Sequence, residues 1–203
     1  MPIQLLNRNN AGNFTLVNRS NSGRLTLQTA AAAAPITYTI GQSALGGTIA
    51  YILQSGDPGY NANIQHGLVI ATTTTTTNTA WNPFTNSFSN SYGTSTAIGT
   101  GAANTAIIIA ANLGTTAAAA CAAVNAGGYN DWYLPSRYEL DAINNALTSG
   151  YNFVAGKYYW SSSEVGSNYS AWCTQWNGPY GGGWSVGQSN NNGAVYSRAV
   201  RSF

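Results

Sequence analysis

Residues 158–203 read YYWSSSEVGSNYSAWCTQWNGPYGGGWSVGQSNNNGAVYSRAVRSF, and this stretch is the most informative part of the chain. Large aromatic residues recur in it between runs of Ser, Gly, Asn and Tyr, and no helical period of apolar residues is present. Antibody loops use the same residue types for contact, because Tyr is rigid and amphipathic whereas Ser, Asn and Gly are adaptable. We therefore predict short strands and loops in which a rigid aromatic frame carries a polar binding surface, which favours binding over catalysis.

The N-terminal part contains a short internal repeat. Residues 6–16 read LNRNNAGNFTL and residues 17–27 read VNRSNSGRLTL, so each copy has a turn-rich half followed by an alternating strand half. Two copies are too few to bury an apolar face alone. We expect residues 1–35, which end in the linker QTAAAAAP, either to order by pairing with other protomers or a larger assembly, or to be a partly disordered tail. The main domain would then span residues 36–203.

Strands and helices are both predicted in the main domain. Apolar runs predict strands over residues 36–41, 48–53 and 67–71, whereas the threonine run at 72–77 fits either a strand or a loop. An Ala- and Ile-rich helix is predicted over residues 104–126, with a break near Gly114. Together with a second helix, these elements predict an α+β fold.

The helix ends carry recognisable signals. Thr115 or Thr116 would cap the part of the first helix that follows the break, and Gly127-Gly128 would end it. Ser136 and Glu139 stand at capping-box spacing and predict the start of the second helix. The buried stripe of that helix would consist of Leu140, Ile143 and Leu147.

Composition limits the classes of function. The chain has 203 residues, of which 6% are charged, and a net charge of +2. Ordinary domains have about 25% charged residues, and a nucleic-acid-binding protein needs a clustered basic face, so we expect no nucleic-acid partner. No signal peptide and no membrane-spanning apolar run is visible, so we expect synthesis in the cytoplasm without membrane insertion. The polar composition suits an external surface.

Reactive side chains are few and scattered. The acidic residues are Asp57, Asp131, Glu139, Asp141 and Glu164, and the single histidine is His66, expected in a loop. Zinc sites need several His or Cys ligands and calcium sites need several close carboxylates, so we expect no metal and no cofactor. No catalytic set is present, so we expect no enzyme. Asp131 and Glu164 should accept hydrogen bonds from loop N–H groups or pair with Arg198 or Arg201, and Cys121 should be buried.

Several motifs occur in the order found in a known protein family. They are residues 96–101 (TAIGTG), residues 128–136 (GYNDWYLPS) followed by Glu139-Leu140, residues 159–164 (YWSSSE) and residues 198–201 (RAVR). Through these motifs, residues 36–203 resemble the Lcl-type C-terminal domain family of adhesin-like modules. The resemblance implies a C-type-lectin-like fold with two helices, short strands and a loop-rich C-terminal half.

The resemblance also implies which residues would vary. Members of the family recur as target proteins of diversity-generating retroelements, in which a reverse transcriptase randomises adenines, so that Asn codons yield several small or polar residue types but not Trp, Gln, Lys, Glu or Met. The implied variable ligand-binding residues are Val165, Gly166, Ser167, Asn168, Tyr169, Cys173, Thr174, Tyr180, Gly181, Gly182, Ser185, Ser189, Asn190, Asn191 and Asn192. The expected structural frame consists of Trp132, Trp160, Glu164, Trp172, Trp176, Trp184, Arg198 and Arg201. Cys173 would then be a surface thiol and not part of a disulfide, and a static low-complexity loop is the alternative.

The function implied by the resemblance is attachment. A variable receptor-binding protein would recognise a protein or glycan on a host cell, as part of a phage or a similar element. It would be located on the virion, at a tail or fibre tip, or on a cell surface, with the N-terminal segment joining it to the particle. We expect a homo-oligomer and favour a trimer. The alternative is a fixed bacterial adhesin or lectin that stacks Trp and Tyr on sugars, whereas a hydrolase or a formylglycine-generating activity on the same fold is not expected.

Overall fold

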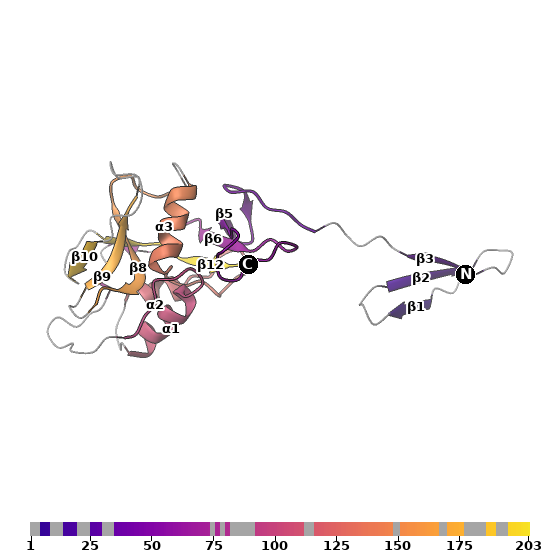
Figure 1. The fold of residues 1–203 in the computed structure, drawn as a ribbon, viewed down its shortest axis with the longest axis horizontal. Helices are drawn as coiled ribbons and strands as arrows, with labels where there is room; N and C mark the ends of the chain where they lie inside the picture. The colour runs from indigo at the N-terminus through magenta and orange to yellow at the C-terminus, as the bar shows by residue number, and fades with distance from the viewer. Residues whose placement is uncertain are drawn as a thin grey trace. The chain divides into compact units, whose positions relative to one another are not determined.

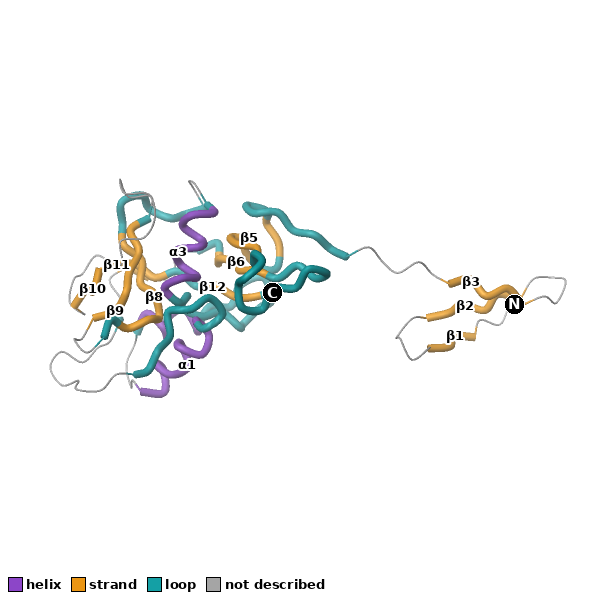
Figure 2. The backbone as a smooth tube through the Cα atoms, viewed as in Figure 1, coloured by secondary structure: helices purple, strands orange, loops and turns teal. Residues whose placement is uncertain are grey.

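The computed structural model describes residues 5–8, 14–19, 25–29, 35–73, 76–77, 80–81, 92–111, 116–147, 151–166, 170–176, 186–189 and 195–203. Within residues 5–29, 76–77 and 186–189 the description is limited to the backbone. The chain divides into two compact units, Met1–Ile36 and Thr37–Phe203. Both are drawn in Figures 1 and 2, and we describe each by itself as the N-terminal unit and the main domain.

The N-terminal unit contains an antiparallel three-stranded sheet. Its strands are β1 (Leu5–Arg8), β2 (Phe14–Arg19) and β3 (Leu25–Thr29), in the order β1-β2-β3. Leu5 pairs with Val17 and Arg19 pairs with Leu25, so the strands pair within one chain. The repeat thus supplies the three strands that are generally the minimum for an independently stable sheet.

The described part of the main domain is an α+β fold with two sheets and three helices. One sheet has the order β10 (Val186–Ser189), β9 (Ser170–Gln175), β8 (Tyr158–Glu164), β11 (Val195–Ser197) and β7 (Thr76–Thr77). The other has the order β12 (Val200–Ser202), β6 (Gly67–Ala71), β5 (Gly47–Ile52) and β4 (Ser43–Ala44). Neighbouring strands are antiparallel except β8 and β11, which run parallel.

Two helices are described in the region of the first predicted helix, and the predicted break near Gly114 lies outside the described residues. Helix α1 (Gly101–Ala111) begins three residues earlier than predicted, and α2 (Ala117–Ala122) ends before residue 126. Thr116 caps α2, because its side chain accepts a hydrogen bond from the Ala119 N–H at 3.0 Å. Among the two predicted capping threonines, Thr116 is therefore confirmed.

Helix α3 (Arg137–Ala146) confirms its sequence signals. Ser136 is the N-cap, and its side chain and that of Glu139 form a complete capping box. Leu140, Ile143 and Leu147 are all almost completely buried. The helix contacts β5 of one sheet and β8 and β9 of the other, and Figure 1 shows it between the two sets of strands. Its apolar stripe therefore contributes to the core that both sheets share.

One predicted strand is wrong. Residues 36–41 form no strand, although the predictions over 48–53 and 67–71 correspond to β5 and β6. Ile36 and Ile40 are 73% and 43% exposed, and of the alternating apolar residues in this run only Tyr38 packs against the core. The backbone of Tyr38 is instead bound at both its N–H and its carbonyl by the side chain of Gln65. Here a loop that is held by the Gln65 side chain has the period-2 alternation that usually indicates a strand.

Both sheets contribute to two hydrophobic core clusters, one of which contains Ile49 and Trp160 and the other Ile70 and Tyr159. Tyr133 and Val200 exchange two backbone hydrogen bonds of 2.8 and 2.9 Å, and Ala71 N–H donates to the Ala199 carbonyl at 3.0 Å. The largest fully buried apolar side chains are Trp160, Trp176, Tyr159, Ile49, Ile70, Ile108, Leu134, Leu140, Ile143 and Leu147. Each buried Trp removes about 150–250 Å² of surface from water, so the aromatic residues dominate the apolar contribution.

Candidate functional site

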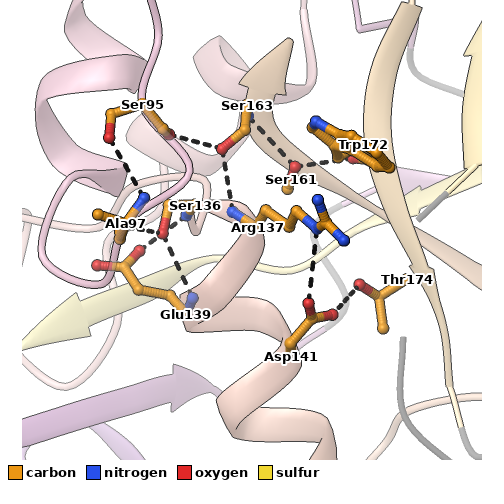
Figure 3. Close-up of polar contacts among 10 residues, drawn as sticks. All are labelled: Ser95, Ala97, Ser136, Arg137, Glu139, Asp141, Ser161, Ser163, Trp172 and Thr174. Atoms are coloured by element: carbon orange, nitrogen blue, oxygen red, sulfur yellow. Dashed lines mark hydrogen bonds and ion pairs between the residues drawn. The ribbon is translucent and has the colours of Figure 1, made fainter. Parts of the chain in front are cut away.

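The capping box at the start of α3 also fixes the loop that precedes α1. The Glu139 carboxylate accepts hydrogen bonds from the N–H groups of Ser136 (2.8 Å) and Gly99 (2.9 Å). Ser136 Oγ in turn donates to the Ala97 carbonyl at 2.8 Å (Figure 3). Burial raises the pKa of Glu139, and the backbone hydrogen bonds oppose that rise. Glu139 is thus a structural anchor whose oxygens are already engaged.

The serines of β8 are internal hydrogen-bonding groups. Ser161, Ser162 and Ser163 are all fully buried. Ser163 Oγ donates to the Ser95 carbonyl (2.7 Å) and accepts from the Arg137 N–H (3.0 Å), as Figure 3 shows. Ser161 Oγ donates to the Trp172 carbonyl at 2.8 Å. These contacts fix the positions of α3 and β9 relative to β8. The sequence gives no direct sign of them, because their partners are up to 68 residues away.

A half-exposed polar and aromatic cluster lies where α3 meets β9. The Arg137 guanidinium carbon lies 3.9 Å from the centroid of the Trp172 ring, and Arg137 Nε lies 3.8 Å from Asp141 Oδ2. Thr174 Oγ1 donates to Asp141 Oδ1 at 2.7 Å (Figure 3). We call these four residues the Arg137 cluster. The side chains of Arg137 and Asp141 are 26% and 20% exposed, so the cluster reaches the surface beside β9.

The electrostatics of the Arg137 cluster are balanced. Burial raises the pKa of Asp141, while the hydrogen bond from Thr174 and the charge of Arg137 act in the opposite direction. A guanidinium stacked on an indole ring is typical of the cation–π contacts that occur at binding surfaces. The sequence analysis missed Arg137 and Asp141. Their spacing of four residues on a predicted helix was the only available signal.

The structure corrects two of the predicted variable residues. Cys173 is fully buried in the core, and Thr174 is 2% exposed. Cys173 cannot be the expected surface thiol, because residues 171 and 173 of β9 face the apolar core. The Thr174 hydroxyl donates a hydrogen bond to the Asp141 carboxylate. As the sequence analysis expected, Cys121 is buried, and the two cysteines form no disulfide.

The other predicted variable residues are described only in part. Val165 is half-buried and Gly166 is exposed, at the turn between β8 and β9. Ser189 ends β10, of whose side chains nothing is described. The predicted residues outside the described ranges are Ser167, Asn168, Tyr169, Tyr180, Gly181, Gly182, Ser185, Asn190, Asn191 and Asn192, together with the frame residue Trp184.

The remaining tryptophans of the predicted frame differ in burial. Trp132, Trp160 and Trp176 are 3%, 1% and 1% exposed, so all three are core residues. Trp176 is stacked on Phe153 with ring centroids 3.6 Å apart. Trp172 is only half-buried, because one face of its ring is covered by Arg137 and not by apolar side chains. The frame therefore includes one tryptophan at the edge of the surface.

Asp131 and Glu164 both make contacts of the expected kinds. Arg201 donates two hydrogen bonds to Asp131, of 2.7 and 2.8 Å, which confirms the predicted pair. Those bonds hold the pKa of Asp131 below its usual range. Glu164 accepts from the N–H and the hydroxyl of Thr94, at 3.3 and 3.2 Å, which confirms the predicted backbone contact.

Arg198 is a buried cation that orders a turn. Its guanidinium donates to the carbonyls of Tyr151 (2.5 Å) and Asn152 (3.2 Å) and lies 4.8 Å from the centroid of the Phe153 ring. Tyr151 and Asn152 have positive φ angles of 56° and 62°, a conformation that L-residues adopt rarely. Burial lowers the pKa of Arg198 to about 10. Arg198 therefore has a structural role in the described part of the chain.

The described residues form no metal site. Among the described residues, no three His, Cys, Asp or Glu side chains come together as a metal site requires. His66 directly precedes β6, in the predicted loop position, and its ring contacts the Phe203 carbonyl. No helix in the described ranges is long and apolar enough to cross a membrane.

Comparison of the chain with protein-family models, with curated proteins and with solved structures gives no match. The function must therefore be argued from the residues and from their arrangement.

Proposed function

We propose that the protein is a variable receptor-binding protein whose main domain is C-type-lectin-like. The observation that carries the proposal is the burial of the aromatic residues that adenine randomisation cannot produce. Trp160 and Trp176 stand on either side of the polar segment 165–169 in the sequence, and each is 1% exposed. A frame of this kind lets the intervening loops change, because exposed substitutions usually alter stability by about 0.5 kcal/mol or less.

The proposed binding surface consists of residues 165–169, 180–182, 185 and 189–192. Cys173 and Thr174 are excluded from it because both are buried. Its described residues Val165 and Ser189 lie beside β9, the strand that carries Trp172 and Thr174 of the Arg137 cluster, because both contact Ser170 through the backbone. The stacked pair of Arg137 and Trp172 would be a constant contact point within a changing surface, because Arg and Trp are enriched among the residues that dominate binding energy.

The biological setting is part of the same proposal. The protein would lie on a virion, at a tail or fibre tip, or on a cell surface, and would bind a host protein or glycan. The three-stranded N-terminal unit would join it to the particle and assemble several copies, with a trimer favoured. Several weak sites on one particle act together, so a modest affinity at each site is sufficient.

The first test is genetic. Sequencing the DNA beside the gene should find a near-copy of the region that encodes residues 165–192, with differences at adenines, next to a reverse-transcriptase gene. Sequences of the gene from many isolates should vary at the proposed surface and not at Trp160, Trp172 or Trp176. A region that is invariant among isolates, with no such copy, would contradict diversification and would favour a fixed adhesin or lectin.

The second test is a binding measurement with a matched control. Replacing Ser167, Asn168 and Tyr169 with alanine should abolish or redirect adsorption of the labelled protein to host cells, without changing its melting temperature. The control replaces a similar set of exposed residues, Ser55, Tyr60 and Asn61, in the loop between β5 and β6. Equal loss of adsorption in both triple variants would contradict the location of the surface.

A further inference from the structure

A cavity of about 340 Å³ lies at the end of the main domain formed by β5, β6 and β12. Figure 1 shows these strands on the other side of α3 from β9 and β10, so the cavity is separate from the proposed binding surface. Small-molecule sites have volumes of about 300–1,000 Å³, and this cavity is at the small end of that range. Its apolar walls are formed by Leu53, Pro58, Leu68, Ile98, Ala102 and Phe203.

The walls of the cavity are held in place by hydrogen bonds. The C-terminal Phe203 exchanges two backbone hydrogen bonds with Gly67, of 3.2 and 3.1 Å. A Cβ at Gly67 would lie 2.8 Å from the Phe203 ring, so only glycine allows the ring to pack there. The loop that contains Ile98 is tied to α3, because Gly99 N–H donates to Glu139. A site with such fixed walls is formed before any ligand binds.

The opposite loop is fixed as well. The Asp57 carboxylate accepts hydrogen bonds from the Tyr51 hydroxyl and the Gln54 N–H, both at 2.7 Å, which hold the turn that leads to Pro58. Burial and the contact with Asp57 raise the pKa of Tyr51 to about 12. Pro58 lies next to Gly99, so the two loops that border the cavity meet.

Polar groups at the cavity are few and specific. The polar side chains that line it are His66, Tyr133, Glu139 and Ser202. His66 Nδ1 contacts the Phe203 carbonyl at 3.1 Å, and because a carbonyl can only accept, Nδ1 carries the proton. In an imidazole whose Nδ1 alone carries a proton, the other nitrogen, Nε2, is a hydrogen-bond acceptor. A ligand with a hydroxyl group can donate to this nitrogen.

The charge of the lining restricts the ligand further. Glu139 is the only charged side chain among the described residues of the lining, and it is fully buried with its oxygens bound by backbone N–H groups. An anion would be repelled by this carboxylate, and no Lys or Arg among the described lining residues offsets the repulsion. A cation would lose its hydration among apolar walls without gaining a direct ion pair, which is costly. The lining therefore favours a neutral molecule.

We propose that this cavity binds a small neutral molecule that consists of one apolar ring and a hydroxyl group, with the hydroxyl donating to His66 Nε2. The ring would pack between Leu68, Ile98 and Phe203. Such a ligand would be constant while the proposed binding surface changes, because none of the described residues that line the cavity belongs to residues 165–192.

The test is a titration of the full-length protein with benzyl alcohol, followed by NMR chemical shifts of the backbone amides. Saturable shifts are expected at Ile98, Gly99 and Ser202. Ala102→Phe fills the cavity and should weaken binding by about tenfold or more, whereas Ala103→Phe should change it by no more than about twofold. Ala103 is the matched control, because it is exposed on the same helix and does not line the cavity.

A second variant addresses the hydroxyl. His66→Asn keeps a donor that can reach the Phe203 carbonyl and removes Nε2, so benzyl alcohol should bind it only as well as ethylbenzene, in which a methyl group replaces the hydroxyl. An equal loss of affinity for both compounds would contradict the role of Nε2. Absence of benzyl alcohol binding up to its solubility limit, or tighter binding of benzylamine or benzoate, would overturn the proposal.

Discussion

Trp176 offers the sharpest test of how the aromatic frame stabilises the main domain. Its ring is 1% exposed, stacks on Phe153 with centroids 3.6 Å apart and meets Tyr159 edge-on at 6.4 Å. Truncation of a buried Trp to Ala costs about 3–5 kcal/mol, and each aromatic pair adds about 0.5–1.5 kcal/mol. The indole N–H opposes these terms, because it is buried and has no hydrogen-bond partner among the described residues.

An unsatisfied buried donor costs about 1–3 kcal/mol, and both Trp176→Ala and Trp176→Phe remove it. We therefore expect Trp176→Ala to lower the free energy of unfolding by about 3 kcal/mol. Trp176→Phe keeps the stack on Phe153, and its free energy of unfolding should stay within about 1 kcal/mol of the wild type. The small cavity that it creates is destabilising, but removal of the unsatisfied N–H is stabilising and offsets that cost. Urea unfolding followed by far-ultraviolet circular dichroism measures both values. A Phe variant as unstable as the Ala variant would refute the reasoning.

Three further predictions concern other parts of the chain. Asp131→Asn should cost only about 1 kcal/mol, because the carboxylate paired with Arg201 is 54% exposed and screened by water. Folding lowers the pKa of Asp131, so the stability that its pair with Arg201 contributes should be lost as the pH falls below about 4. Melting temperatures measured against pH should show this loss in the wild type and not in Asp131→Asn. Gly101→Ala should lower the melting temperature, because its Cβ would lie 2.7 Å from the Tyr133 ring, and overpacking costs about 1–3 kcal/mol; an unchanged melting temperature would contradict this contact. Deleting residues 1–34 should give a folded monomer by light scattering, and a truncated protein that stays oligomeric would place the interface in the main domain.

The elements with local signals were predictable from the sequence. The capping box of Ser136 and Glu139 and the Thr116 cap depend on residues three positions apart, so their spacing is visible in the chain itself. The apolar run 67–71 became a fully buried strand because β5 and β12 pair on either side of it. Residues 36–41 alternate apolar and polar side chains but belong to neither sheet, because a partner strand far away in sequence leaves no local trace.

The site was less predictable because its contacts are long-range. The argument from the residues that a randomised Asn codon can encode placed Cys173 on the surface. The register of β9 against β8 instead directs its side chain into the core. The same reasoning placed Trp172 and Trp160 together in the frame. One face of the Trp172 ring, however, contacts Arg137, and the ring is only half-buried. Residue type therefore indicates what a position tolerates chemically, and only the strand register determines which face of the sheet it occupies.

The separation of the two proposed sites has a physical consequence. Ser161 and Ser163 bind β8 to β9 and α3, whereas the cavity is bordered by β6, β12 and two loops held by Glu139 and Asp57. Changes in residues 165–192 that leave β8 and β9 intact keep the Ser163 hydrogen bonds to Ser95 and to the Arg137 N–H, which hold the loop and the helix that border the cavity. The surface can therefore be exchanged while the cavity keeps its shape and its ligand.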